Sequence, residues 1–113
     1  EPSHKRLASE RPTVRGWEWW LMREAKMRNP AIRFHGLPWG WPGYLGPWKR
    51  LFDQKADAAA EYIVAWVRLA AEQGFQIDSV GLWNEKRYEE RYIFALRAAL
   101  DRAGFAETLV AAA

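Results

Sequence analysis

Three helical patterns alternate with three short apolar runs along this 113-residue chain, and this order limits the possible folds most strongly. Apolar residues recur at helical spacing over residues 16–28, 55–72 and 88–103. Residues 32–37, 77–83 and 108–113 have the short apolar runs that are typical of strands. Strands that alternate with helices favour parallel pairing through right-handed crossovers, so we expect an α/β fold.

Proline and glycine mark the breaks between these segments. Asn29-Pro30 ends the first helix, because proline disfavours the helical conformation of the residue before it, and Gly74 and Gly104 end the other two. Residues 38–48 contain three prolines and three glycines, so we expect a long loop without regular structure. This loop also carries aromatic side chains, which makes it the most unusual segment of the chain.

The length of the chain leaves two interpretations of the fold open. Three parallel strands have two free edges, and parallel sheets are normally covered on both faces. The chain is therefore either a compact three-layer mini-domain or a segment of a (β/α)8 barrel, which needs about 250 residues. We favour the barrel segment on the size of the fold, because 113 residues supply only three strands with open edges and the last strand ends with no element to close the sheet.

Composition excludes several classes of function. The net charge of +3 is too weak for a nucleic-acid groove, and no run of 18 apolar residues predicts a transmembrane segment. Cysteine is absent, and the two histidines, His4 and His35, lack the spacing of metal ligands, so we expect neither a metal nor another cofactor. The charged opening residues 1–6 are not followed by the apolar stretch of a secretory signal.

Eight of the 113 residues are tryptophan, and six of them fall into two groups. Trp17, Trp20 and Trp66 lie on helical stripes, so we predict that they are core residues. The loop at residues 38–48 holds three more, Trp39, Trp41 and Trp48, which we interpret as residues lining the rim of a site.

In parallel α/β folds, functional groups collect in the loops after the carboxyl ends of the strands. Trp39 follows the first strand, and the second runs directly into Asn84-Glu85. Aromatic surroundings raise the pKa of a carboxyl group by desolvation, which suits a general acid, and aromatic rings stack on sugars. Strict strand alternation would point Asn84 and Glu85 in opposite directions, so both face one ligand only if the strand bulges or ends there. The alternative is structural: Glu85 complements the dipole of the next helix, and the tryptophans only pack.

Six motifs of the chain carry a resemblance to a known family: residues 1–4 (EPSH), 15–26 (RGWEWWLMREAK), 28–30 (RNP), 36–39 (GLPW), 42–43 (PG) and 81–85 (GLWNE). They resemble the galactocerebrosidase family, whose members are retaining β-galactosidases acting on galactosylceramide, within clan A of the (β/α)8-barrel glycoside hydrolases. The resemblance implies that residues 1–113 are an internal fragment of the catalytic TIM barrel, from about strand three to strand five. It also implies two partners: a β-galactoside or galactolipid substrate, and the remaining half of the barrel.

The resemblance assigns roles to three residues. Glu85 matches the catalytic acid/base, Asn84 the asparagine that binds the sugar near its 2-hydroxyl, and Trp39 the tryptophan lining the galactose pocket. The chain departs from the family at Lys86, where arginine is usual, at Arg87, and most of all at residues 47–57. These departures leave the aglycone open. Animal members are lysosomal, but the sequence itself fixes no localisation.

The implied double displacement needs a second carboxylate as nucleophile. Asp78 begins its strand, at the far end of the barrel, and Asp53 lies in the irregular loop, so neither fits. The family places the nucleophile on strand seven, beyond Ala113, and we expect the 113-residue chain alone to be inactive. The other hypotheses are a clan A glycosidase with different sugar specificity and a carbohydrate-binding fragment without catalysis.

Overall fold

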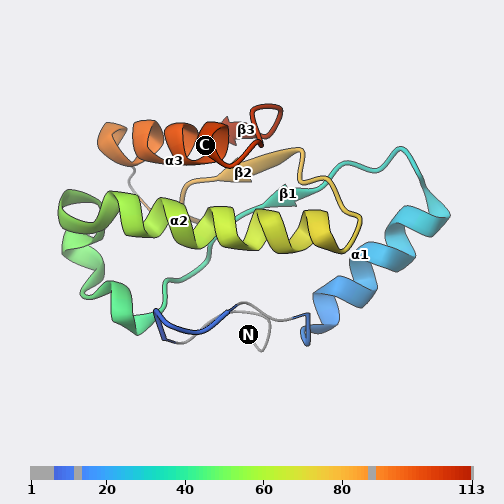
Figure 1. The fold of residues 1–113 in the computed structure, drawn as a ribbon, viewed down its shortest axis with the longest axis horizontal. Coiled ribbons are helices and arrows are strands. Elements are labelled where there is room, and N and C mark those ends of the chain that lie inside the picture. The colour runs from blue at the N-terminus through green and yellow to red at the C-terminus, as the bar shows by residue number, and fades with distance from the viewer. Residues whose placement is uncertain (1–6, 12–13, 87–88, 113) are drawn as a thin grey trace.

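The computed structural model describes residues 7–11, 14–86 and 89–112, and it shows helices and strands in alternation (Figure 1). This order confirms the expected α/β class. The elements, in chain order, are α1 (Trp17–Arg28), β1 (His35–Gly36), the 3-10 helices η1 (Gly43–Leu45) and η2 (Trp48–Arg50), α2 (Leu51–Glu72), β2 (Ser79–Gly81), α3 (Glu90–Arg102) and β3 (Leu109–Ala111).

The three strands form one parallel sheet in the order β1-β2-β3. His35 pairs with Ser79, which in turn pairs with Leu109, so the three strands are level across the sheet. Each helix between two strands is a crossover connection, as expected for neighbouring parallel strands. A parallel three-stranded α/β unit of this kind fits a part of a barrel.

The elements differ from the predicted bounds in two ways. The strands are shorter than the apolar runs, because only two or three residues of each run pair with a neighbouring strand. Helix α2 begins four residues before the predicted start at residue 55 and includes Asp53, which we had placed in the loop. Lys55 has non-helical backbone angles (φ −134°, ψ 29°), so a kink joins a short first segment to the predicted helix. The predicted loop itself contains the two 3-10 turns.

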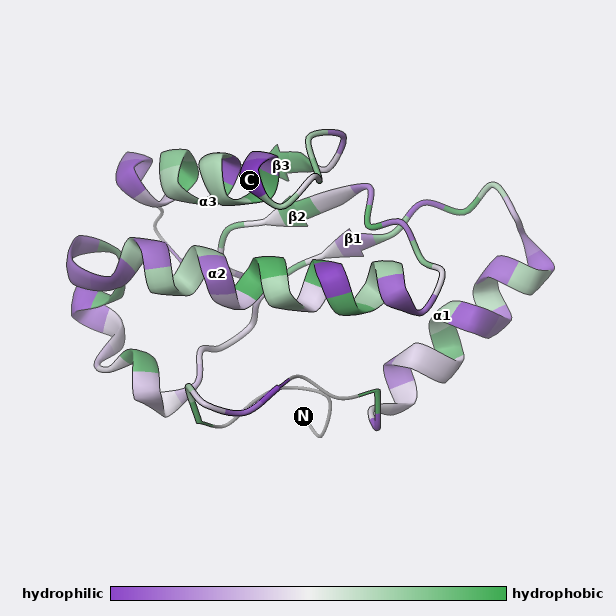
Figure 2. Ribbon diagram, viewed as in Figure 1, coloured by the Kyte–Doolittle hydropathy of each residue, from purple (hydrophilic) through white to green (hydrophobic). Residues whose placement is uncertain are grey.

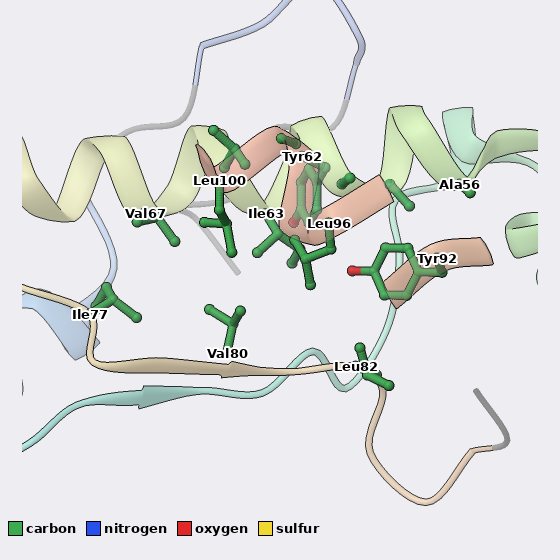
Figure 3. Packing of buried hydrophobic residues seen from close by; sticks show 14 of the residues in the cluster. Ala56, Tyr62, Ile63, Val67, Ile77, Val80, Leu82, Tyr92, Leu96 and Leu100 are labelled. Carbon is green, nitrogen blue, oxygen red and sulfur yellow. The ribbon is translucent and has the colours of Figure 1, made fainter. Parts of the chain in front are cut away.

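The hydrophobic core lies on one side of the sheet, under α2 and α3 (Figure 3). In Figure 3, Ile77, Val80 and Leu82 point from the β2 segment toward side chains of the two helices. Both helices have buried and polar sides, and Figure 2 shows hydrophobic and hydrophilic residues interleaved along them. The fully buried side chains with the largest volumes are Tyr92, Leu51, Ile77, Leu96, Leu100, Val64, Val67 and Val80.

The opposite face of the sheet is not covered by a helix in the described part of the chain. Leu109 of β3 is 59% exposed, and the His35 side chain on the other edge strand, β1, is exposed as well. His35 Nδ1 lies 2.8 Å from Ser79 Oγ, and a Cβ at Gly81 would lie 2.6 Å from Leu37 Cδ1, so these side chains share that face. The described residues thus form two layers, not the three of the mini-domain interpretation.

The prediction for the tryptophans of α1 is wrong in part. Trp17 and Trp20 are 63% and 59% exposed, whereas Trp19 is 3% exposed and packs against Trp66 and Phe75. Apolar residues occur on more than one side of this helix, so helical spacing alone cannot say which side faces the core. Trp66 packs partly buried against the core, as predicted.

Gly36 shows how closely α2 approaches the sheet, and it carries a stability prediction. A Cβ at Gly36 would lie 2.7 Å from the Trp66 ring, which itself packs against Trp19. We expect Gly36→Ala to lower the melting temperature of the full-length protein, because overpacking of this kind costs about 1–3 kcal/mol. Gly40→Ala is the matched control, since a Cβ there meets nothing within 4 Å. Equal melting temperatures of the two variants would contradict the packing described here.

Candidate active site

Two hydrogen bonds, each accepted by a backbone carbonyl, join the loops that follow β1 and β2. The Asn84 N–H donates a hydrogen bond to the Pro38 carbonyl at 2.9 Å, and Trp83 Nε1 donates one to the Trp39 carbonyl at 3.4 Å. The strand-end rule predicted that these two segments would share one edge of the sheet. The structure brings the Trp39 segment and the Asn84-Glu85 segment together at that edge.

Glu85 sits in a turn rather than in a strand. The Lys86 N–H donates to the Trp83 carbonyl at 3.4 Å, and Glu85 has φ 54°, in the left-handed region. Glycine and asparagine favour this conformation, and it costs other residues about 1–2 kcal/mol. β2 already ends at Gly81, so strand alternation does not govern the directions of Asn84 and Glu85. A strained glutamate in a turn is a signal of function rather than of stability.

The helix-dipole explanation for Glu85 does not fit the structure. The N-cap of α3 is Glu89, and the acidic residue in its first turn is Glu90. Glu85 therefore lies four residues before the cap, outside the range in which a charge interacts with the end of a helix.

The described residues do not form the expected apolar enclosure of Glu85. Glu85 is exposed, Asn84 is half-buried and Trp39 is 78% exposed. No hydrogen bond or ion pair joins the Glu85 carboxylate to another of the described residues. Any walls of a pocket around these side chains must come from elsewhere.

An aromatic cluster lies directly beneath the Glu85 turn. The Trp41 ring contacts Phe52, Trp83 and Tyr92 edge-on, with centroid distances of 5.8, 6.1 and 5.8 Å, and Phe52 stacks on Tyr92 at 4.3 Å. Trp41 is thus a packing residue, and its predicted place on the rim is wrong. The cluster holds Trp83, the residue just before Asn84, by ring contacts on one side and by the bond to Trp39 on the other.

Burial also affects the tyrosines near this cluster. Desolvation raises the pKa of Tyr92, and desolvation, followed by the nearby Tyr44, raises the pKa of Tyr62 to about 12. These hydroxyl groups therefore stay protonated at any physiological pH. They are structural groups and carry no acid/base chemistry.

Trp48 is the second tryptophan of the loop that is exposed, and its place on the rim of a site stays a prediction. It is 59% exposed, and its ring lies 6.4 Å from that of Trp83. Lys49 Nζ and Lys86 Nζ lie 5.6 and 5.9 Å from the centre of the Trp48 ring. Sequence reasoning missed this grouping, because Lys86 reaches Trp48 only after the turn at Glu85 reverses the chain.

The other carboxylates lie away from Glu85 or serve structural roles. Asp78 accepts a hydrogen bond from the Phe34 N–H at 2.7 Å and pairs with Arg33 at 3.6 Å, at the amino end of β2. This end of the sheet is opposite to the one that carries Glu85, as predicted. Asp53 lies in the first turn of α2, where it complements the helix dipole.

A cavity of about 910 Å³ borders the free edge of β1. Its lining includes Trp17 and Leu21 of α1, Trp66 of α2 and Trp39, but neither Asn84 nor Glu85. The cavity therefore extends along the unpaired edge of the sheet and shares Trp39 with the site at the strand ends.

The described ranges show neither a metal-binding cluster nor a membrane-spanning helix. No three His, Cys, Asp or Glu side chains group there as a metal ion would require. None of the helices found there is long and apolar enough to cross a membrane.

Comparison with known proteins identifies the family. The model of glycosyl hydrolase family 59 matches residues 1–113. The chain belongs to glycosyl hydrolase family 59. It is 45% identical to the galactocerebrosidase of Danio rerio over 117 residues, and 44% identical to that of Homo sapiens over 108 residues. The alignments cover 100% and 92% of this family 59 chain.

These family 59 relatives are much longer than the chain. It spans 17% of the Danio rerio protein and 15% of the human one. The resemblance to galactocerebrosidases read from the sequence motifs is thereby confirmed over the whole chain, and the remaining parts of such proteins lie outside these 113 residues.

Proposed function

We propose that the protein containing this chain is a retaining glycosidase that removes terminal β-galactose from galactosylceramide-like substrates. Residues 1–113 form an internal part of its catalytic (β/α)8 barrel, in which β1, β2 and β3 are about strands three, four and five. The bond from the Asn84 N–H to the Pro38 carbonyl carries this proposal, because it holds Trp39 and Asn84-Glu85 at one edge of the sheet. The family match and the names of the relatives supply the substrate class.

The open face of the sheet supports the barrel. Leu109 and Leu37 are large apolar residues on a face that parallel sheets normally bury. In a barrel this face points inward, where side chains of the other strands cover it. Both edge strands would also gain neighbours, and the exposed rim tryptophans would line a concave mouth.

Glu85 is the general acid and base in this proposal. As a carboxylic acid it gives its proton to the glycosidic oxygen while a second carboxylate, outside this chain, attacks the anomeric carbon and the C–O bond breaks. As a carboxylate it then takes a proton from the water that releases the sugar. Asn84 binds the sugar near its 2-hydroxyl, and Trp39 packs against the galactose ring. No step requires a cofactor.

The turn at Glu85 supports its proposed role as both the general acid and the general base. Trp83 lies in the aromatic cluster, and Glu85, two residues later, has the left-handed backbone conformation of a turn. The carboxyl group is exposed and free of other bonds within the described residues, so it can approach a glycosidic oxygen.

Replacing Trp39 tests the proposed sugar platform. Trp39→Ala in the full-length protein is expected to lower kcat/KM for an aryl β-galactoside about 10-fold, since a ring contact of this kind contributes about 0.5–1.5 kcal/mol. Trp20→Ala is the matched control, because Trp20 is also exposed but lies on α1.

The stereochemistry of the product tests retention. The anomer of galactose first released, read by NMR, is expected to be β. An α product, or equal effects of the two variants, would contradict the proposal.

A second substitution tests the anchor of the Glu85 turn. Trp83→Phe keeps a ring in the aromatic cluster but removes the N–H that donates to the Trp39 carbonyl. We expect kcat to fall about 3- to 10-fold with a smaller change in KM, since a neutral hydrogen bond contributes about 0.5–1.5 kcal/mol. Steady-state kinetics separates the two constants, and an unchanged kcat would show that the bond does not position Glu85.

A further inference from the structure

We propose that Trp48, Lys49 and Lys86 form an aglycone subsite that favours β-galactosides carrying an anionic group on the aglycone. The inference rests on the proposed function, because that function places Glu85 at the glycosidic oxygen. It adds a substrate class that the names of the relatives do not contain.

The first argument is position. A general acid must reach the glycosidic oxygen, the atom that joins the sugar to the aglycone, so the groups next to it border the leaving group. Lys86 follows Glu85 directly, and Lys86 Nζ lies 5.9 Å from the centre of the Trp48 ring. The Trp48 ring in turn contacts Trp83, two residues before Glu85.

The second argument is the apolar surface. Trp48 lies in the short turn η2 and is more than half exposed, although its edge contact with Trp83 fixes it in place. A fixed, exposed indole beside a catalytic group is a surface on which an aromatic or aliphatic aglycone can pack.

The third argument is charge. Two ammonium groups, of Lys49 and Lys86, approach the same ring, and neither forms an ion pair with another of the described residues. Arg50 adds a third basic residue in the same turn. The acidic residues near this point in the sequence are Asp53 in the first turn of α2, Glu89 and Glu90 at the start of α3, and Glu85 itself.

The experiment compares two substrates that differ in charge but not in leaving-group ability. The full-length protein is assayed with 4-(carboxymethyl)phenyl β-galactoside and with the methyl ester of the same compound. We expect kcat/KM to be about 3- to 10-fold higher for the acid than for the ester, because two exposed charge pairs contribute an effect of this size. The preference is expected to shrink in 1 M salt, where charges are screened within about 3 Å.

Three variants assign the preference to the proposed residues. Lys49→Gln with Lys86→Gln is expected to bring the ratio of acid to ester close to one. Arg23→Gln with Arg68→Gln removes the same charge from exposed positions on α1 and α2 and is expected to leave the ratio unchanged. Trp48→Ala is expected to lower kcat/KM for both substrates by about 2- to 10-fold.

The outcomes separate this inference from the proposed function. Equal kcat/KM values for acid and ester in the unmodified protein, or a preference that survives the double lysine variant, would overturn the subsite while leaving the glycosidase proposal standing. Hydrolysis of neither substrate would overturn the proposed function itself, and the subsite with it.

Discussion

Replacing Glu85 with glutamine in the full-length protein is expected to lower kcat/KM for β-galactosides with poor leaving groups by about 10²–10⁴-fold, the usual contribution of a general acid and base. Glutamine has nearly the same size and cannot release a proton. An alkyl galactoside needs protonation of its leaving oxygen, so its hydrolysis shows the largest loss. From a 2,4-dinitrophenyl galactoside, the phenolate leaves without protonation. The first step, formation of the glycosyl intermediate, should therefore be nearly unaffected by Glu85→Gln with this substrate.

Glu90→Gln provides the control for this prediction. Glu90 is exposed and lies in the first turn of α3, where its charge complements the helix dipole. We expect its replacement to change kcat/KM less than 2-fold, because its role is structural. Equal losses from Glu85→Gln and Glu90→Gln, or a loss that does not depend on the leaving group, would contradict the acid role of Glu85.

The second prediction with a large expected effect is that the isolated 113-residue chain, unlike the full-length protein, has no glycosidase activity. Retention requires two carboxyl groups about 5–5.5 Å apart. Within the described residues, Asp78 lies at the amino end of β2 and is bonded to Phe34, so it cannot meet Glu85. The purified chain should therefore release no detectable phenol from an aryl β-galactoside. Turnover that disappears in Glu85→Gln would show that a nucleophile is present in this chain.

Much of the fold follows from local patterns. The alternation of helical and strand-like runs predicted the parallel sheet, because short crossovers leave few other arrangements. The start of α2 did not follow, since the kink at Lys55 hides a helical segment inside a run that looks like a loop. The choice of Trp19 over Trp17 and Trp20 as the buried residue did not follow either, because packing against Trp66 decides it.

The site was predictable in its position but not in its local geometry. The rule that loops at strand ends carry function placed Trp39 and Glu85 at one edge, and the bond between Asn84 and Pro38 agrees with it. The left-handed conformation of Glu85 could not be read from the sequence, because glutamate is a rare residue at such a turn position. The approach of Lys86 to Trp48 depends on that turn and was hidden with it.

Rescue by azide tests the central claim, that Glu85 is the acid/base of a retaining β-galactosidase, most directly. Glu85→Gly suits the backbone, because glycine adopts φ 54° without strain, and it opens space for a small anion. Without a base the second step is slow, and azide, which needs no deprotonation, can attack the glycosyl intermediate instead. With 2,4-dinitrophenyl β-galactoside, the account predicts faster turnover in azide and β-galactosyl azide as the product by NMR. A rate that azide does not change, or an α-galactosyl azide product, would contradict it.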